Sequence, residues 1–196
     1  IIDIVKRSEK EGYKGPLTIR FPHLIRKQIR TLYSKFETSI KEYEYKGKFN
    51  AVFPLKVNQY PSFLQPLIQE AKDYNYGLEA GSKAELLIAM AYNNKNAPIT
   101  VNGFKDKKMI HLGFMAKQMN HDVTLTIEGL NELTTIIEVH KETKLSCPNI
   151  GLRVRLHSSG SGIWAKSGGI DSKFGLSSTE ILDALEILEK NNMTPY

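Results

Sequence analysis

Residues 50–92 read NAVFPLKVNQYPSFLQPLIQEAKDYNYGLEAGSKAELLIAMAY, and this one stretch holds two strand-like runs and two helix-like patterns. The strand-like runs, rich in β-branched and apolar residues, are Asn50–Lys56 and Tyr76–Glu79. The helix-like patterns, with apolar residues at helical spacing, are Ser62–Tyr74 and Ser82–Tyr92. Ser82 stands three residues before Glu85, which is typical of a capping box. The stretch therefore predicts two consecutive strand–helix units.

The same alternation continues to the end of the chain with a period of roughly 25 residues. The further predicted strands are Ile99–Asn102, Val123–Glu128 and Ile150–Leu156. The further predicted helices are Asp106–Met119, Asn131–Lys141 and Ser178–Lys190, with one more before the first strand, from Pro22 to about Tyr43. Strands that alternate with helices are parallel, and no Gly-x-Gly-x-x-Gly turn follows any strand. The pattern predicts an α/β fold, a partial TIM-like (β/α)8 barrel.

The predicted domain plan has two parts, residues 1–48 as an N-terminal segment with a helix and residues 49–196 as the N-terminal part of the barrel. Only its first five strands are present, whereas closure takes eight, so we expect the rest of the barrel beyond Tyr196.

Charge and composition narrow the classes of partner. The 196 residues carry a net charge of +6, but Lys and Arg are interleaved with Glu and Asp, so we expect no nucleic-acid partner. No window approaches the roughly 20 consecutive apolar residues of a membrane helix, so we expect no membrane partner. Cys147 is the only cysteine, which excludes an internal disulfide and fits a cytoplasmic location.

Period-2 alternation assigns the two faces of each strand. The residues of the last two strands that we expect to face helices are Val123, Leu125, Ile127, Leu152, Val154 and Leu156. The inward-facing residues at or near the carboxyl ends of the strands are Lys56, Glu79, Asn102, Glu128, Arg153 and Arg155. Because barrel enzymes place their catalytic groups at this end, the pattern predicts a polar site. Lys56 would either be partly desolvated, and so nucleophilic, or pair with Glu79 in a structural salt bridge.

Longer motifs carry a resemblance to a known family. They are FPLKVNQ at 53–59, GLEAGSKAEL at 77–86, NGFKD at 102–106, GLRVRL at 151–156, and a segment that runs from GSGIW at 160–164 through SGG at 167–169 to SKFGL at 172–176. These motifs resemble the alanine-racemase-type barrel decarboxylases that use pyridoxal phosphate (PLP), in particular the biosynthetic arginine decarboxylases. Ornithine and diaminopimelate decarboxylases share the lysine and the Lys-Phe-Gly triplet, but typically lack the Trp-containing loop.

The resemblance implies PLP-dependent decarboxylation of L-arginine to agmatine in polyamine and spermidine biosynthesis. It implies that Lys56 is catalytic and holds PLP through its amine, and that Glu79, Glu85 and Arg153 bind the cofactor. Lys173 would match an interface lysine of the ornithine enzymes. The family likeness also suggests Mg²⁺, for which no ligand set is evident in the sequence, and a homo-oligomer, either a dimer or a tetramer. The resemblance further implies a C-terminal β domain beyond Tyr196 that carries the catalytic cysteine of the family. Cys147 is not that cysteine, because its setting before Pro148 does not match.

Other functions remain open at this point. The same chemistry would serve a decarboxylase for ornithine, lysine or diaminopimelate. A non-catalytic PLP-binding barrel would keep Lys56 and lack the substrate side. A basic nucleic-acid-binding module would need a clustered basic patch, which the sequence does not show.

Overall fold

A five-stranded parallel sheet forms the centre of the computed structural model, which describes residues 1–156 and 174–193 of the chain. The strands are β1 (Val52–Pro54), β2 (Gly77–Ala80), β3 (Pro98–Val101), β4 (Asp122–Ile127) and β5 (Asn149–Leu152). They pair in the order β1-β2-β3-β4-β5, so each strand lies beside its neighbours in sequence. Between consecutive strands the chain crosses over through one α-helix at a time, as parallel neighbours require.

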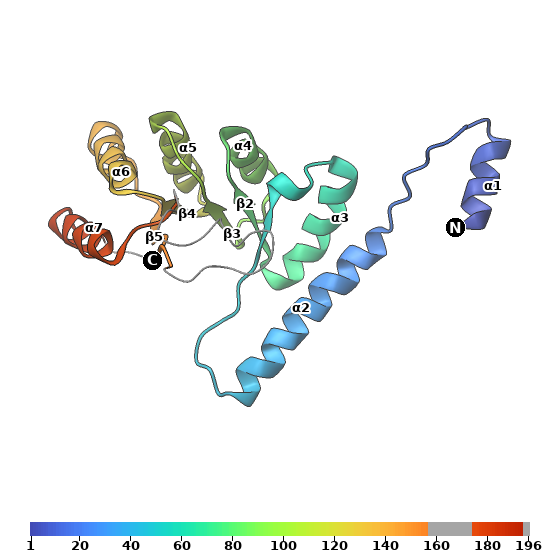
Figure 1. Ribbon diagram of the computed structural model, residues 1–196, viewed down its shortest axis with the longest axis horizontal. Coiled ribbons are helices and arrows are strands. Elements are labelled where there is room, and N and C mark those ends of the chain that lie inside the picture. The colour runs from blue at the N-terminus through green and yellow to red at the C-terminus, as the bar shows by residue number, and fades with distance from the viewer. Residues whose placement is uncertain (157–173, 194–196) are drawn as a thin grey trace.

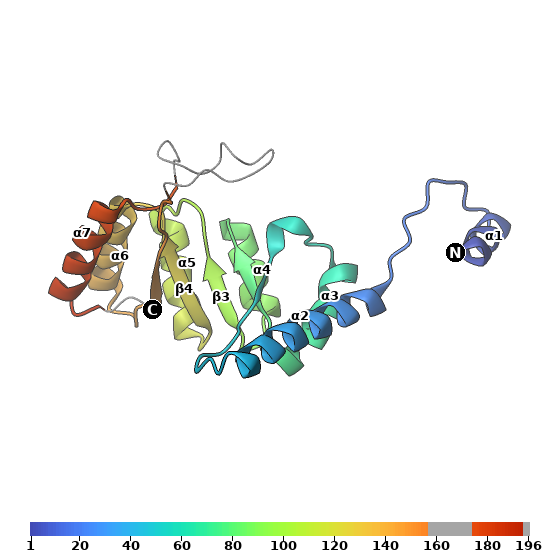
Figure 2. The same cartoon turned by 60° about the horizontal axis from the view of Figure 1, so that its bottom comes forward.

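The helices that connect the strands lie along one face of the sheet, as Figures 1 and 2 show for α4 to α7. The helices are α1 (Ile2–Lys10), α2 (Pro22–Glu42), α3 (Pro61–Ala71), α4 (Lys83–Tyr92), α5 (Lys107–Gln118), α6 (Leu130–Thr143) and α7 (Ser178–Lys190). Two 3₁₀ turns, η1 (Leu55–Val57) and η2 (Lys72–Tyr74), follow β1 and α3. Parallel strands in sequence order with helices on one face are successive units of a (β/α)8 barrel, which confirms the predicted fold class.

The long helix α2 packs against α3 outside the row of α4 to α7 (Figure 1). Arg26 and Arg30 of α2 both bind the carboxylate of Glu70 in α3, with N–O distances of 2.9 and 2.8 Å. Glu70 is only 5% exposed, so these two guanidinium groups compensate a buried charge. The helix α1 was not predicted from the sequence; it buries no residue and lies apart from the sheet (Figure 2).

The core between the sheet and the helices follows the predicted alternation in β4. Val123, Leu125 and Ile127 are fully buried, while the residues between them are half-buried on the opposite face. Helix α5 reaches this layer closely, because a Cβ atom at Gly113 would lie 2.7 Å from Cδ2 of Leu125. Apolar side chains toward the helices leave the inner face of the sheet for polar groups.

The prediction for the last strand is wrong in part. Strand β5 ends at Leu152, which is half-buried against the core, so Val154 and Leu156 do not continue the helix-facing row and are 53% and 65% exposed. The chain leaves the β4 ladder here, and Val154 instead forms a parallel bridge with Leu176. The first strand is also shorter than predicted, because a 3₁₀ turn begins directly after Pro54.

None of the helices in the described ranges combines the length and hydropathy needed to cross a membrane. The division of the chain at residues 48 and 49 stays a prediction.

Candidate functional site

A cavity of about 520 Å³ opens where the carboxyl ends of the strands meet. Its walls are formed by Lys56, Glu79, Gly81, Glu85, Asn102, Gly103, Thr126, Arg153 and Phe174. The fold thus brings the four residues selected from the sequence, Lys56, Glu79, Glu85 and Arg153, to one cavity. They come from three βα units, since Glu79 and Glu85 both belong to β2–α4, and the parallel topology brings the ends of the units to the same edge of the sheet.

Lys56 lies in the 3₁₀ turn η1 and not at the end of a strand. Lys56 is exposed, so the desolvation expected of its amine is wrong for this structure. It makes no ion pair within residues 1–156 and 174–193, so the alternative, a structural salt bridge with Glu79, is wrong as well. Lys56 also borders a second cavity of about 600 Å³ beside Arg20 and Tyr60. Its amine therefore stands between two open spaces, accessible to an incoming group.

Glu79 is one of two buried glutamates in the cavity wall, with 7% of its surface exposed. Its neighbours Leu78 and Ala80 are fully buried on the helix side, as the alternation predicts, so Glu79 faces inward. Nδ2 of Asn102 donates a hydrogen bond of 3.1 Å to its Oε1 atom. Its Oε2 atom is buried and has no hydrogen-bond partner in the described part of the chain. A buried carboxylate oxygen of this kind favours a ligand that carries a donor or a positive charge.

Glu85 reaches the cavity from the first turn of α4. The hydroxyl of Ser82 accepts from the Glu85 amide at 3.3 Å, which forms one half of the predicted capping box. The other half differs, because the Glu85 carboxylate accepts from the amide of Gly81 at 2.7 Å and not from that of Ser82. Reaching one residue further back carries the carboxylate past the helix end to the cavity wall, where Gln59 also donates to it at 3.4 Å.

Arg153 follows β5 and crosses to Glu128 at the end of β4. Its Nη1 atom lies 3.0 and 3.1 Å from the two oxygens of Glu128, which is only 3% exposed. The guanidinium also lies over the ring of Phe174, 5.0 Å from its centroid, and Phe174 stacks on Phe104. These contacts hold a cationic group and an aromatic face on one wall of the cavity.

Arg155 was expected beside Arg153 but lies elsewhere. Its guanidinium donates to the carbonyl of Gly175 at 2.8 and 3.1 Å, and it does not line the cavity. The cause is the early end of β5, which breaks the alternation on which the prediction rested.

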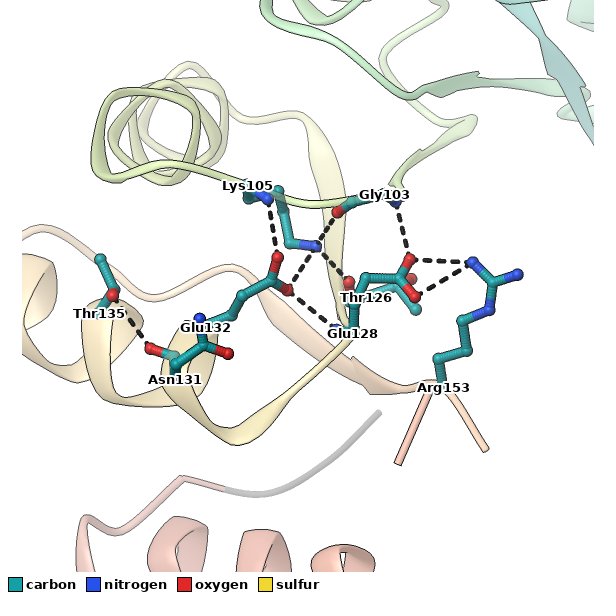
Figure 3. Close-up of polar contacts among 8 residues, drawn as sticks. All are labelled: Gly103, Lys105, Thr126, Glu128, Asn131, Glu132, Thr135 and Arg153. Atoms are coloured by element: carbon teal, nitrogen blue, oxygen red, sulfur yellow. Dashed lines mark hydrogen bonds and ion pairs between the residues drawn. The ribbon is translucent and has the colours of Figure 1, made fainter. Parts of the chain in front are cut away.

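A buried ion pair, Lys105 with Glu132, lies behind the cavity wall, and neither residue was selected from the sequence. Figure 3 shows Lys105 and Glu132 joined to Gly103, Thr126, Glu128 and Arg153 by a continuous set of polar contacts. The available signals were Glu132 four residues after Glu128 at the start of a helix, and Lys105 within the NGFKD motif.

The Gly- and Ser-rich segment 158–169 with Trp164, and also His157 and Lys173, lie outside the described residues. Within the described ranges no three His, Cys, Asp or Glu side chains gather as a metal site would require. Cys147 is half-buried, and burial raises the pKa of its thiol to about 11. This thiol does not line the cavity, in agreement with its exclusion as a catalytic group.

Comparison with known proteins identifies the family of this chain. The family model described as "Pyridoxal-dependent decarboxylase, pyridoxal binding domain" matches residues 26–194. The chain belongs to this family. The biosynthetic arginine decarboxylase of Phocaeicola vulgatus is 39% identical over 192 residues, and that of Bacteroides thetaiotaomicron is 38% identical. Each alignment covers 97% of this chain and 30% of the relative, so the chain spans about a third of the length of these relatives.

Solved structures agree with this family membership. The crystal structure of the biosynthetic arginine decarboxylase from Campylobacter jejuni superposes with a TM-score of 0.89 at 60% identity, over 98% of this chain and 30% of that one. Diaminopimelate decarboxylase from Helicobacter pylori superposes with a TM-score of 0.67 at 19% identity, over 95% of this chain and 43% of that one. The second likeness shows the barrel fold alone.

Proposed function

We propose that this chain is the PLP-binding part of an enzyme that decarboxylates L-arginine to agmatine. The choice of L-arginine as the substrate rests on the 60% identity to the arginine decarboxylase of Campylobacter jejuni over nearly the whole chain. The observation that carries the cofactor is the family match together with the polar cavity.

The residues of the cavity fit PLP, which offers an aldehyde, a protonatable ring and a phosphate. The exposed amine of Lys56 suits the aldehyde, because a lysine is the usual covalent partner of PLP. The unpartnered oxygen of Glu79 suits a donor or a cationic ring. Gly81 and Gly103 have no side chains, which leaves room for a flat ring at the wall.

In this proposal PLP supplies an electron sink for the electron pair left when carbon dioxide departs. The protein supplies orientation and charge. Arg153, held by Glu128, presents a fixed positive charge and its NH groups to the cavity. Glu79 and Glu85 keep negative charge on the opposite side, and Lys56 contributes the only lysine amine among the cavity-lining residues that the structure describes.

The wider assignments rest on the relatives. We propose a role in polyamine biosynthesis including spermidine, a cytoplasmic location and a homo-oligomer, either a dimer or a tetramer. Mg²⁺ rests on the family likeness alone and has no set of ligands in the described part of the chain.

The test is product formation by the protein expressed from its whole reading frame and loaded with PLP. Agmatine and carbon dioxide should form from L-arginine, and Lys56→Ala should abolish their formation. Borohydride reduction followed by peptide mapping should place the pyridoxyl group on Lys56. A pyridoxyl group on Lys83 with Lys56 unmodified would contradict the assignment.

The same assay separates the alternatives. Preferred turnover of ornithine, lysine or diaminopimelate would replace the proposed substrate. PLP bound to Lys56 with no release of carbon dioxide from any of the four amino acids would indicate a non-catalytic PLP-binding barrel.

A further inference from the structure

Lys105 is the most deeply buried lysine side chain for which the structure gives an ion pair, with none of that side chain exposed. Its Nζ atom lies 2.9 Å from Oε2 of Glu132 and donates to the carbonyls of Gly103 and Thr126 (Figure 3). An ammonium group has three N–H donors, and these three acceptors use them all. The Nζ atom of Lys105 is therefore fully engaged, and Lys105 is not a second candidate for the amine that captures PLP.

Glu132 is equally saturated. One of its oxygens accepts from the backbone amide of Lys105 at 2.7 Å. The other accepts from the backbone amide of Glu128 at 2.9 Å and binds the ammonium of Lys105. Glu132 is 3% exposed, so the pair holds two buried charges, and the cost of their desolvation offsets much of their mutual attraction. A contribution to stability is therefore a weak explanation for this ion pair. Its contacts with the residues of the cavity wall suggest a role in positioning them.

Three residues of the cavity wall are tied to this pair. The peptide of Gly103 is held on both sides, since its carbonyl accepts from Lys105 and its amide donates to Glu128 at 2.8 Å. The carbonyl of Thr126 accepts from Lys105 as well. Glu128, whose backbone is bound by Glu132, in turn binds Arg153.

We infer that Lys105 and Glu132 are positioning residues that fix Arg153 and the Gly103 peptide at the cavity for cofactor binding. The inference rests on the proposed function, because it takes the cavity to be the PLP site. Neither residue lines the cavity that holds Lys56, Glu79 and Arg153, so the pair acts on that cavity through Glu128 and the backbone of Gly103 and Thr126.

The experiment measures PLP affinity of the apo-protein, expressed from the whole reading frame, by titration with PLP and absorbance. Glu132→Gln keeps the size of the side chain, but in either orientation its NH₂ group faces a donor: the backbone amide of Lys105 in one, and the amide of Glu128 with Nζ of Lys105 in the other. We expect PLP binding to weaken about tenfold or more, the usual scale for the loss of a residue that orients a ligand-binding group. Glu132→Asp keeps the charge and the fold but withdraws the carboxylate by one methylene, and we expect it to weaken binding in the same direction.

The double variant Lys105→Met with Glu132→Gln removes both buried charges and tests whether the pair matters beyond stability. The matched control is Lys107→Met with Glu142→Gln. Lys107 lies two residues after Lys105, at the start of α5, and forms an exposed ion pair of 2.6 Å with Glu142 of α6, the helix that also carries Glu132. We expect weakened PLP binding in the buried-pair variant and a change of less than about twofold in the control.

A cycle with Arg153→Ala identifies the route of the effect. If the pair acts through Arg153, Glu132→Gln should weaken PLP binding much less when Arg153 is already replaced. Equal weakening in both backgrounds, or full PLP affinity in Glu132→Asp, would overturn the inference. PLP titration does not depend on turnover, so failure of the unaltered protein to decarboxylate arginine would refute the proposed substrate and leave this result interpretable.

Discussion

Replacement of Glu79 by Gln should separate stability from cofactor binding. Glu79 is 7% exposed, its Oε1 accepts from Asn102, and its Oε2 has no hydrogen-bond partner in the described residues. Gln has the same size and keeps an oxygen for Asn102, so the substitution removes a buried charge and one unpaired charged acceptor. A buried polar group without a partner costs roughly 1–3 kcal/mol. Because the new NH₂ group also lacks a partner, we expect a gain of about 1 kcal/mol in the apo-protein.

PLP binding should change in the opposite direction. A hydrogen bond to a charged group contributes about 1.5–3 kcal/mol, so loss of the carboxylate should weaken PLP binding roughly ten- to a hundredfold. The assay pairs the thermal unfolding midpoint of the apo-protein with a PLP titration of the same sample.

Glu70→Gln is the matched control, because Glu70 is similarly buried but bound by both Arg26 and Arg30. Its replacement leaves two arginines without their partner, so the unfolding midpoint should fall while PLP affinity stays unchanged. A Glu79 variant that loses stability and binds PLP normally would refute the reasoning, because Glu79 would then behave like Glu70.

Further predictions concern the sheet, a buried histidine and the cysteine. Gly77→Ala places a Cβ atom 1.9 Å from the backbone carbonyl oxygen of Pro98, so it should destabilise the protein by about 1–3 kcal/mol or more in denaturant titration; an unchanged midpoint would contradict this close approach. Burial and the charge of Lys95 lower the pKa of His121 below its ordinary value of 6.5, so the unfolded chain binds more protons and stability should fall as the pH drops below about 6.5. His121→Phe should flatten that dependence, and a wild-type midpoint that is constant between pH 5 and 7 would argue against it. Cys147, whose pKa is raised to about 11, should react slowly with iodoacetamide at pH 8 and rapidly after unfolding; fast labelling of the native protein would contradict its burial.

Much of the fold could be predicted from local patterns. Helical spacing of apolar residues located six of the seven helices in residues 1–156 and 174–193, because an amphipathic stripe is a strong signal over ten or more residues. Helix α1 was missed, since it lies at the start of the chain and buries nothing. The strand ends were predicted less well: whether the backbone continues a ladder after Pro54 or Leu152 depends on the partner available there and not on the side chains.

The candidate site could be predicted only in part, because its residues were inferred from the same strand pattern. Alternation and the family motifs selected Glu79 and Arg153, and both line the cavity. Arg155 was predicted to line the site but does not, because β5 ends at Leu152 and the alternation stops there. Lys56 is exposed, because it lies in a 3₁₀ turn and not in the strand. Lys105 and Glu132 were not selected, because their importance arises from contacts across three βα units that no single stretch of sequence displays.

The sequential order of the sheet has a consequence for how the chain is made. Each strand pairs with the strand just before it, and the paired residues, such as Val52 with Gly77 and Ile99 with Val123, are about 25 residues apart in sequence. Short separations of this kind favour fast closure of each contact. Since a chain emerges from the ribosome N-terminus first, β2 can pair with β1 before β3 is synthesised. Each later strand can then pair with the strand before it, which is already folded. The arc can therefore grow one unit at a time during translation, with Gly103 and Glu128 meeting only when the fourth unit arrives.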